Sequence, residues 1–239
     1  MNRRQFFAAS ALAAAAAAPV TALAITEARD DDRVAPARPL SLPPDGFIST
    51  AVVIGPGVNV IDMSGPWEVF QDAAIYGGLG RFELFTASDA TDPVEASGGL
   101  RITPTYSFDD APQPHVVVVP AHDASPATSD WLRHVAPSAQ LLMSVCTGAF
   151  VLAETGLLDG KTATTHHGSY DDFAAMFPKI KLVRGQRFVE HAHVATAGGL
   201  TSGIDLALRV VERYLGSEGA AATAQYMEYS SPGRYSYTG

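Results

Sequence analysis

The amino-acid sequence predicts an α/β protein, a three-layer sandwich built on a mainly parallel sheet of the flavodoxin-like kind. First, short apolar runs alternate along the chain with segments of helical pattern. Second, the run from His115 to Val119 is apolar on both faces, which is typical of a strand in the middle of a parallel sheet. Third, Cys146 lies between an apolar run and a helical segment, as at the sharp strand-to-helix turn called a nucleophile elbow.

The first half of the fold is expected to place strands at residues 50–54, 82–86, 115–119 and 141–145. A hairpin is expected over residues 94–107, around Gly98-Gly99. The first helix should cover residues 64–76, with Ser64 as its N-cap, Pro66 in its first turn and Gly77-Gly78 after its end. A second helix is expected over residues 126–135.

The second half begins with a helix over residues 147–158, directly after the cysteine. We then expect a short strand at 162–166, a helix at 169–177 and a pair of strands within 188–196. An amphipathic helix follows at 201–215 and a shorter helix at about 219–229, and the last residues, SSPGRYSYTG, should be loose.

The amino terminus reads as an export signal. It has paired Arg3-Arg4, then Phe6, an alanine-rich apolar stretch and small residues before a cleavage site after Ala24. The paired arginines indicate the twin-arginine route and hence the periplasm. A membrane anchor is the alternative, but the apolar stretch is too short and too rich in alanine. We therefore expect a cleaved signal at residues 1–24, a flexible lead-in at 25–47 and a single domain at 48–230.

Charge and cysteine content limit the classes of partner. The 239-residue chain carries a net charge of −9, and removing the two signal arginines gives −11 (−9 minus 2). Nucleic acid and anionic membrane are therefore poor partners, which favours a small-molecule substrate. A single cysteine excludes an internal disulfide, so Cys146 is a reactive thiol or forms an intermolecular bridge.

Cys146 is the main candidate for chemistry. Small residues two positions away on each side, Ser144 and Gly148, allow the backbone to turn tightly. The following helix presents its N-terminus to the thiol, which would lower the pKa of the cysteine and favour a thiolate. The alternative is a small buried apolar side chain, the ordinary state of a free cysteine.

Carboxylates and histidines near strand ends are candidates to assist the thiol. Asp62 follows the first strand and could project from the strand–helix loop toward the site, or it could be a local capping residue. Glu68 competes for the same role. His166, after the strand at 162–166, could act as an acid or base, or it could be hydrogen-bonded in the core. His191 and His193 lack a third ligand of suitable spacing, so no metal site is predicted.

The stretch from Thr196 to Asp205, TAGGLTSGID, contains small residues that let two backbones approach closely. We interpret it as packing behind the elbow or as an edge of the site. A phosphate loop is disfavoured because the stretch has no lysine.

Four segments together resemble the ThiJ/PfpI superfamily, within the class I glutamine amidotransferase-like fold. They are VIDMSGPWEVF, VVVVP, SVCTGAFVLAETGLLDGKTATTHH and TAGGLTSGIDLALRVVERYLG, in the family's order across residues 48–216. The IDMSGPWEVF stretch is similar to the isonitrile hydratase branch and to the sensing halves of AraC-type regulators. The resemblance implies Cys146 as nucleophile, Asp62 as its acidic partner and Thr147 as a further site residue. It also implies a homodimer and no cofactor.

The implied reaction is the hydration of an isonitrile. The Cys146 thiolate would attack the terminal carbon, and protonated Asp62 would deliver a proton and then assist water, releasing an N-substituted formamide. Ala121-His122 stands where the family usually has Gly-Gly, so these two residues, with Gly148 and His166, are expected to border the substrate. His122 is also a candidate acid or base. The alternatives are a non-catalytic small-molecule binding module, a redox sensor using the same thiol, and the peptidase or glyoxalase activities of the superfamily.

Overall fold

A seven-stranded sheet forms the middle of the protein. The computed structural model describes residues 38–76 and 81–230, all within one unit, Val34–Gly239. The sheet has the order β10-β11-β7-β6-β1-β2-β5, and only the β10–β11 pair is antiparallel. Its strands are β1 (Phe47–Val53), β2 (Arg81–Ser88), β5 (Tyr106–Ser107), β6 (Val116–Val119), β7 (Leu141–Ser144), β10 (Phe188–Glu190) and β11 (Val194–Ala197).

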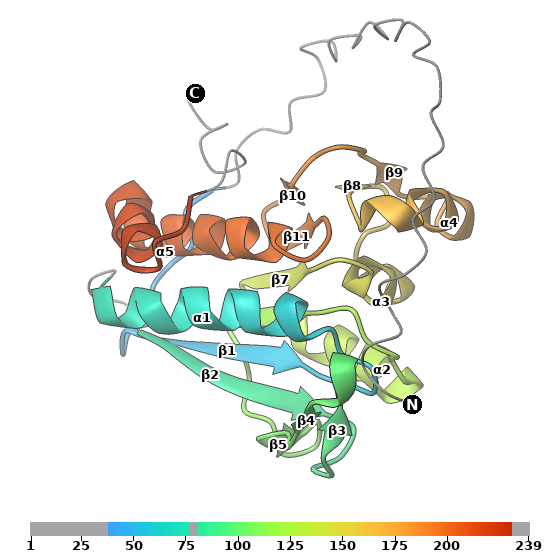
Figure 1. Ribbon diagram of the computed structural model, residues 1–239, viewed down its shortest axis with the longest axis horizontal. Coiled ribbons are helices and arrows are strands. Elements are labelled where there is room, and N and C mark those ends of the chain that lie inside the picture. The colour runs from blue at the N-terminus through green and yellow to red at the C-terminus, as the bar shows by residue number, and fades with distance from the viewer. Residues whose placement is uncertain (1–37, 77–80, 231–239) are drawn as a thin grey trace, which may run out of the picture. The chain divides into compact units, whose positions relative to one another are not determined.

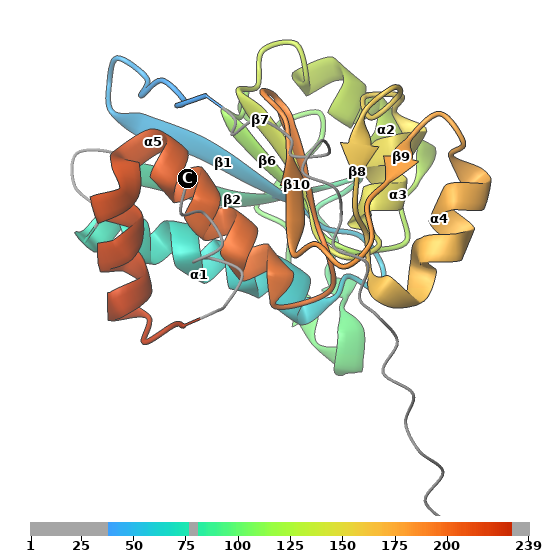
Figure 2. The same ribbon diagram turned by 90° about the horizontal axis from the view of Figure 1, so that it is seen from above.

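Helices cover both faces of this sheet, which confirms the three-layer prediction (Figures 1 and 2). One face carries α1 (Val60–Tyr76) and α5 (Ser202–Tyr226), and the other carries α2 (Pro126–Val135), α3 (Gly148–Glu154) and α4 (Tyr170–Met176). The central strand β6 is fully buried, with Val116 and Val118 packed in the cluster under α1 and α5 and with Val117 and Val119 in the cluster under α2 and α3. An apolar run on both faces of a strand is what two such layers require.

Two small sheets lie outside the main one. β3 (Val94–Glu95) and β4 (Arg101–Ile102) form the expected hairpin, with a 3₁₀ turn at Ser97–Gly99 between them. β8 (Thr162–Ala163) pairs with β9 (Lys181–Leu182). The strand expected at 162–166 is therefore only two residues long, and Thr164 to His166 form a loop. This loop passes close to the elbow, as described below.

The first helix begins earlier than the sequence suggested. The side-chain oxygen of Asn59 accepts hydrogen bonds from the amides of Ile61 (3.2 Å) and Asp62 (3.4 Å), as an N-cap does. The prediction of Ser64 as the cap was wrong, because Ser64 lies inside α1. Asp62 consequently lies in the first turn of a helix and not in a loop.

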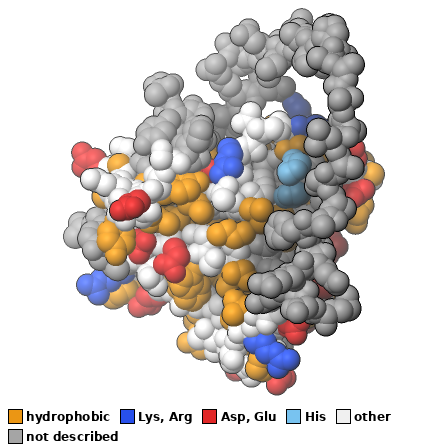
Figure 3. Space-filling model, viewed as in Figure 1, with side chains coloured by type: hydrophobic (Ala, Val, Ile, Leu, Met, Phe, Trp, Pro, Cys, Tyr) orange, Lys and Arg blue, Asp and Glu red, His pale blue; other side chains and the backbone are white. Residues whose placement is uncertain are grey.

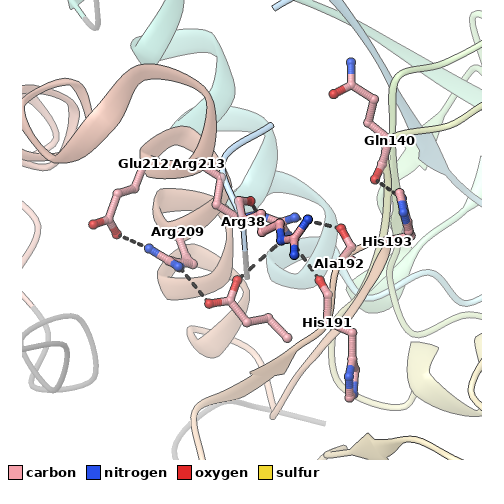
Figure 4. A network of polar contacts seen from close by, with 9 residues as sticks. Arg38, Gln140, His191, Ala192, His193, Arg209, Glu212 and Arg213 are labelled. Atoms are coloured by element: carbon pink, nitrogen blue, oxygen red, sulfur yellow. Dashed lines mark hydrogen bonds and ion pairs between the residues drawn. The ribbon is translucent and has the colours of Figure 1, made fainter. Parts of the chain in front are cut away.

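The last helix packs over the β10–β11 hairpin through a buried ion network. Glu190 of β10 pairs with Arg209 (2.8 Å) and Arg213 (3.8 Å), one helical turn apart on α5 (Figure 4). All three side chains are almost completely buried. The sequence predicted two helices here, and α5 does contain a non-helical residue, Gly216, with φ +76°.

The segment that leads into β1 is bound to the domain. The guanidinium of Arg213 donates to the carbonyl of Arg38 (3.0 Å), and the amide of Leu40 donates to the carbonyl of Arg213 (2.8 Å). Ser41 and Gln140 exchange two hydrogen bonds of 3.1 and 2.9 Å. The expectation of a flexible lead-in up to residue 47 is therefore incorrect from Arg38 onward, and Phe47 already belongs to β1.

Some sequence predictions lie outside the described residues. These are the signal at 1–24, the lead-in up to residue 37, the Gly77-Gly78 stop and the end of the chain after residue 230. Among the helices that the structure describes, none has the length and hydropathy needed to span a membrane.

Candidate active site

Cys146 lies at a strained turn immediately after β7. Its φ is +59°, a left-handed conformation that costs a residue with a Cβ on the order of 1–3 kcal/mol. Hydrogen bonds hold this backbone: the Cys146 amide donates to the carbonyl of Gly198 (2.9 Å), and the hydroxyl of Thr165 donates to the carbonyl of Cys146 (2.9 Å). The predicted nucleophile elbow is present, and the surrounding loops maintain its strain.

Glycine is required at position 148, where the turn enters α3. A Cβ at Gly148 would lie 2.0 Å from the carbonyl oxygen of Val119 and 2.8 Å from that of Pro120. The end of β6 therefore lies directly against the elbow. The same closeness applies on the other side, where a Cβ at Gly203 would lie 2.9 Å from the side chain of Val145. The TAGGLTSG stretch packs behind the elbow, as expected.

Asp62 reaches the elbow from the first turn of α1. Its side chain is completely buried, and its Oδ2 accepts a hydrogen bond of 3.4 Å from the amide of Ala121. Its Oδ1 is buried without a hydrogen-bond partner among the described residues, although the Cys146 thiol is close enough to lower the pKa of Asp62. The structure thus brings together a thiol and a carboxyl that are 84 residues apart in sequence (146 minus 62).

Burial sets the proton affinity of this pair. It raises the pKa of Asp62 to about 6, against the opposing effect of hydrogen bonds from Ala121, the thiol and Leu200. Burial and the neighbouring Asp62 charge raise the pKa of Cys146 to about 11. Between these values the pair binds one proton. Burial opposes the expected thiolate, whereas the amides of Thr147 and Leu200 favour it.

Two backbone amides favour the charged forms of the pair. The amides of Thr147 and Leu200 both lower the pKa of Cys146, and the Leu200 amide also lowers that of Asp62. Leu200 has a φ of +53° and is, after Cys146, the second strained residue of this region. Its backbone amide is directed at Cys146. Leu200 was not predicted as a site residue. It lies in the stretch from Thr196 to Asp205, which we interpreted as packing behind the elbow or as an edge of the site.

Thr147 follows the cysteine in helical conformation and is partly buried. Its side chain makes no capping hydrogen bond to α3. Glu68 is exposed and accepts a hydrogen bond from Gln71 (3.4 Å), so it does not compete with Asp62.

His122 does not project beside the thiol. Its ring fills the space above Gly55, where a Cβ would lie 2.7 Å from the ring carbon Cδ2. Its Nδ1 lies 2.8 Å from the carbonyl oxygen of Pro120. Burial lowers the pKa of His122, although Asp89 and Asp123 oppose this, so the ring is neutral near pH 7. The groups that shift the pKa of Cys146 do not include His122.

His166 lines a hollow of about 360 Å³ beside the elbow. Its Nδ1 accepts a hydrogen bond from the amide of Gly168 (3.1 Å), which places the ring proton on Nε2, near Gly199. Thr165 and Leu200, which contact the elbow, also line the hollow. Neither Cys146 nor Asp62 is among the residues that line the hollow.

His191 and His193 contact backbone carbonyl groups. Nε2 of His191 lies 2.8 Å from the carbonyl oxygen of Thr162, and Nδ1 of His193 lies 3.3 Å from that of Gln140 (Figure 4 shows the second contact). Among the described residues, no three metal-binding side chains lie together in a cluster that could hold an ion.

Comparison with known proteins agrees with the geometry. The sequence model of the DJ-1/PfpI family matches residues 49–213. The isonitrile hydratase of Pseudomonas putida is 32% identical over 182 residues, which cover 73% of this chain and 75% of that enzyme. The HTH-type transcriptional regulator CdhR of Pseudomonas aeruginosa is 27% identical over 71% of this chain, which spans about half (52%) of the regulator.

The solved structures agree on the fold. A ThiJ/PfpI family protein from Pseudomonas syringae superposes with a TM-score of 0.69 at 26% identity, covering 81% of this chain and 80% of that one.

Proposed function

Because the chain belongs to the DJ-1/PfpI family, we propose that it is a cysteine-dependent enzyme that adds water to a small molecule, and that this molecule is an isonitrile. The observation that carries the proposal is the buried pair of Cys146 and Asp62, which holds a single proton at neutral pH. A buried carboxyl with a pKa of about 6 can both accept and return a proton under these conditions.

In the first step, the ionised Asp62 accepts the thiol proton as sulfur attacks the terminal carbon of the isonitrile. The amides of Thr147 and Leu200 stabilise the charge that develops on sulfur. The new C–S bond leaves negative charge on the carbon, and protonated Asp62 returns the proton there. The product is a thioimidate, R–N=CH–S–Cys146, and Asp62 is again ionised.

In the second step, water adds to the thioimidate carbon while Asp62 accepts one of its protons. Asp62 passes this proton to the nitrogen and then accepts the proton of the new hydroxyl as the C=O forms and the C–S bond breaks. It finally returns that proton to sulfur. The sum is R–NC + H₂O → R–NH–CHO, an N-substituted formamide, and these steps need neither a metal nor an organic cofactor. The hydroxyl of Thr147, which does not cap α3, is available to orient the water or the substrate nitrogen.

The pH dependence of turnover tests whether the singly protonated pair of Cys146 and Asp62 is the active form. Because the base is the carboxylate, kcat/KM should rise as the pH increases through about 6 and then stay level up to at least pH 9. The measurement is formamide formation from cyclohexyl isonitrile between pH 4.5 and 9.5. A rate that falls between pH 6 and 8 would mean that a required proton is lost in this range, which would contradict the singly protonated pair as the active form.

A non-catalytic binding module is the second candidate, since CdhR, a transcriptional regulator, is similar to this chain. The same assay separates the two. Saturable isonitrile binding without formamide would support the binder, and neither binding nor turnover would refute both. A redox sensor would be indicated by oxidation of Cys146 to the sulfinic acid with mild peroxide, read by mass spectrometry.

We further propose a homodimer that is exported to the periplasm. Hydrophobic side chains gather along the α1–α5 face (Figure 3), where Ile61 and Leu200 are 36% and 40% exposed. Such a patch favours association. Sedimentation of the chain without residues 1–24 and cell fractionation of the full chain measure the two properties.

A further inference from the structure

We propose that His122 is a positioning residue that holds the amide of Ala121 on the carboxylate of Asp62. The inference rests on the proposed function where it concerns turnover. The part of the inference that concerns the ionisation of Asp62 is independent of the proposed function, because this ionisation can be measured without substrate.

The ring of His122 is fixed in one tautomer. A carbonyl oxygen can only accept, so the contact of 2.8 Å between Nδ1 and the carbonyl of Pro120 requires a proton on Nδ1. The neutral ring then has no proton on Nε2, and this atom is buried without a hydrogen-bond partner among the described residues. Leaving Nε2 unpaired has a cost. The hydrogen bond through Nδ1 is the polar interaction that the ring retains.

The carbonyl of Pro120 and the amide of Ala121 belong to the same peptide group. A peptide group is planar, and rotation of its oxygen rotates its N–H equally. The hydrogen bond from His122 therefore sets the direction of the Ala121 N–H, which is the group that donates to Oδ2 of Asp62. At 3.4 Å this second bond is long, so a small rotation would break it.

Two backbone hydrogen bonds hold the neighbouring residues. Neither involves the Pro120–Ala121 peptide group, whose oxygen lies against Gly148. Asn59 donates to the carbonyl of Ala121 (2.8 Å) and Asp123 donates to the carbonyl of Pro56 (2.9 Å), which join the loop after β6 to the loop after β1. Gly55 supplies the space for the ring. The side chain at position 122 thus acts on Asp62 through the backbone, without touching the thiol.

The test is the ionisation midpoint of Asp62 in variants of His122. The C=O stretch of a protonated carboxyl gives this midpoint by infrared titration, and the band is assigned by its loss in Asp62→Asn. His122→Phe keeps a ring without the donor, and His122→Ala removes both. Both should raise the midpoint by about 0.5–1 pH unit, because Asp62 loses a hydrogen bond to its charged form. The thiol of Cys146 is the titrating neighbour of Asp62, so the titration is kept below pH 8.

Two further variants complete the experiment. His122→Asn retains a donor and should restore most of the wild-type midpoint. His193→Ala removes a similar contact between a histidine and a backbone carbonyl at the β10–β11 turn and should leave the midpoint unchanged. If His122→Ala fails to fold, His122→Phe decides.

A wild-type midpoint in folded His122→Phe would overturn the inference. A shifted midpoint in a protein whose wild type forms no formamide would retain the inference and refute the proposed function. If the wild type forms formamide and the low-pH midpoint of kcat/KM is unchanged in His122→Phe, the proposed function is retained and the inference is refuted.

Discussion

Cys146→Ser should reduce formamide formation by at least about 10³-fold, because the reaction as proposed passes through a bond to sulfur and a serine hydroxyl is a far weaker nucleophile near neutral pH. The variant should remain folded, since serine has nearly the same size and the backbone turn is held by Gly198 and Thr165. Formamide release is measured with the protein at high concentration, so that a loss of this size remains quantifiable.

Two controls make the Cys146 result specific. Cys146→Ala should be as inactive as Cys146→Ser, because both lack the thiol, and both should show wild-type far-ultraviolet circular dichroism. Since Cys146 is the only cysteine, either variant should also show no reaction with a thiol reagent. Turnover within tenfold of wild type in folded Cys146→Ala would rule out covalent catalysis.

Asp62→Asn should have opposite effects on turnover and on the intrinsic reactivity of the thiol. The amide cannot accept the thiol proton, so kcat/KM should fall by about 10²–10⁴-fold. The charge of Asp62 raises the pKa of Cys146, so its removal should increase alkylation by iodoacetamide at pH 8 by about tenfold, the change expected for one pKa unit. If Asp62 served the fold alone, its substitution would not lower kcat/KM and at the same time increase alkylation of the thiol.

The same substitution should stabilise the protein above pH 6. The folded-state pKa of Asp62, about 6, lies above the ordinary value of 3.8 for an aspartate. The folded state therefore prefers the protonated form, and its stability declines as the pH rises from about 4 to 6. Asparagine avoids this cost of about 2–3 kcal/mol, which urea denaturation at pH 7.5 can measure. Equal stability of wild type and variant at pH 7.5 would contradict the burial of an ionised Asp62.

Much of the fold could be predicted because the signals are local. The apolar run of β6 and the helical pattern of α2 are properties of adjacent residues, and the α2 bounds agree at both ends. Asn59 was missed as a cap because Ser64 offered an equally good local signal one turn later. The strand at 162–166 was overextended because the sequence does not show that Thr164 and Thr165 leave the sheet to support the elbow.

The site was only partly predictable, because its properties depend on contacts between residues that are far apart in the sequence. Cys146 and Asp62 were identified, and the structure brings them together. The raised pKa of the thiol depends on burial and on the charge of Asp62, which no local pattern reports. His122 was expected at the thiol because it follows β6, but its direction depends on the absence of a side chain at Gly55, 67 residues earlier (122 minus 55).

The contact between Arg38 and Arg213 has a practical consequence for anyone who shortens this protein. The side chain of Arg213 also donates to the carbonyls of Ala192 (2.7 Å) and His191 (3.4 Å), so one guanidinium ties the entry of the chain, the edge hairpin and α5. A recombinant version that starts at residue 42 would strip away the cover supplied by Arg38 and Leu40. Water would then reach the guanidinium of Arg213, which is otherwise shielded. The edge strand β10, which pairs with β11, would become less stable. A shortened version should therefore begin upstream of Arg38, even where residues 1–24 are removed.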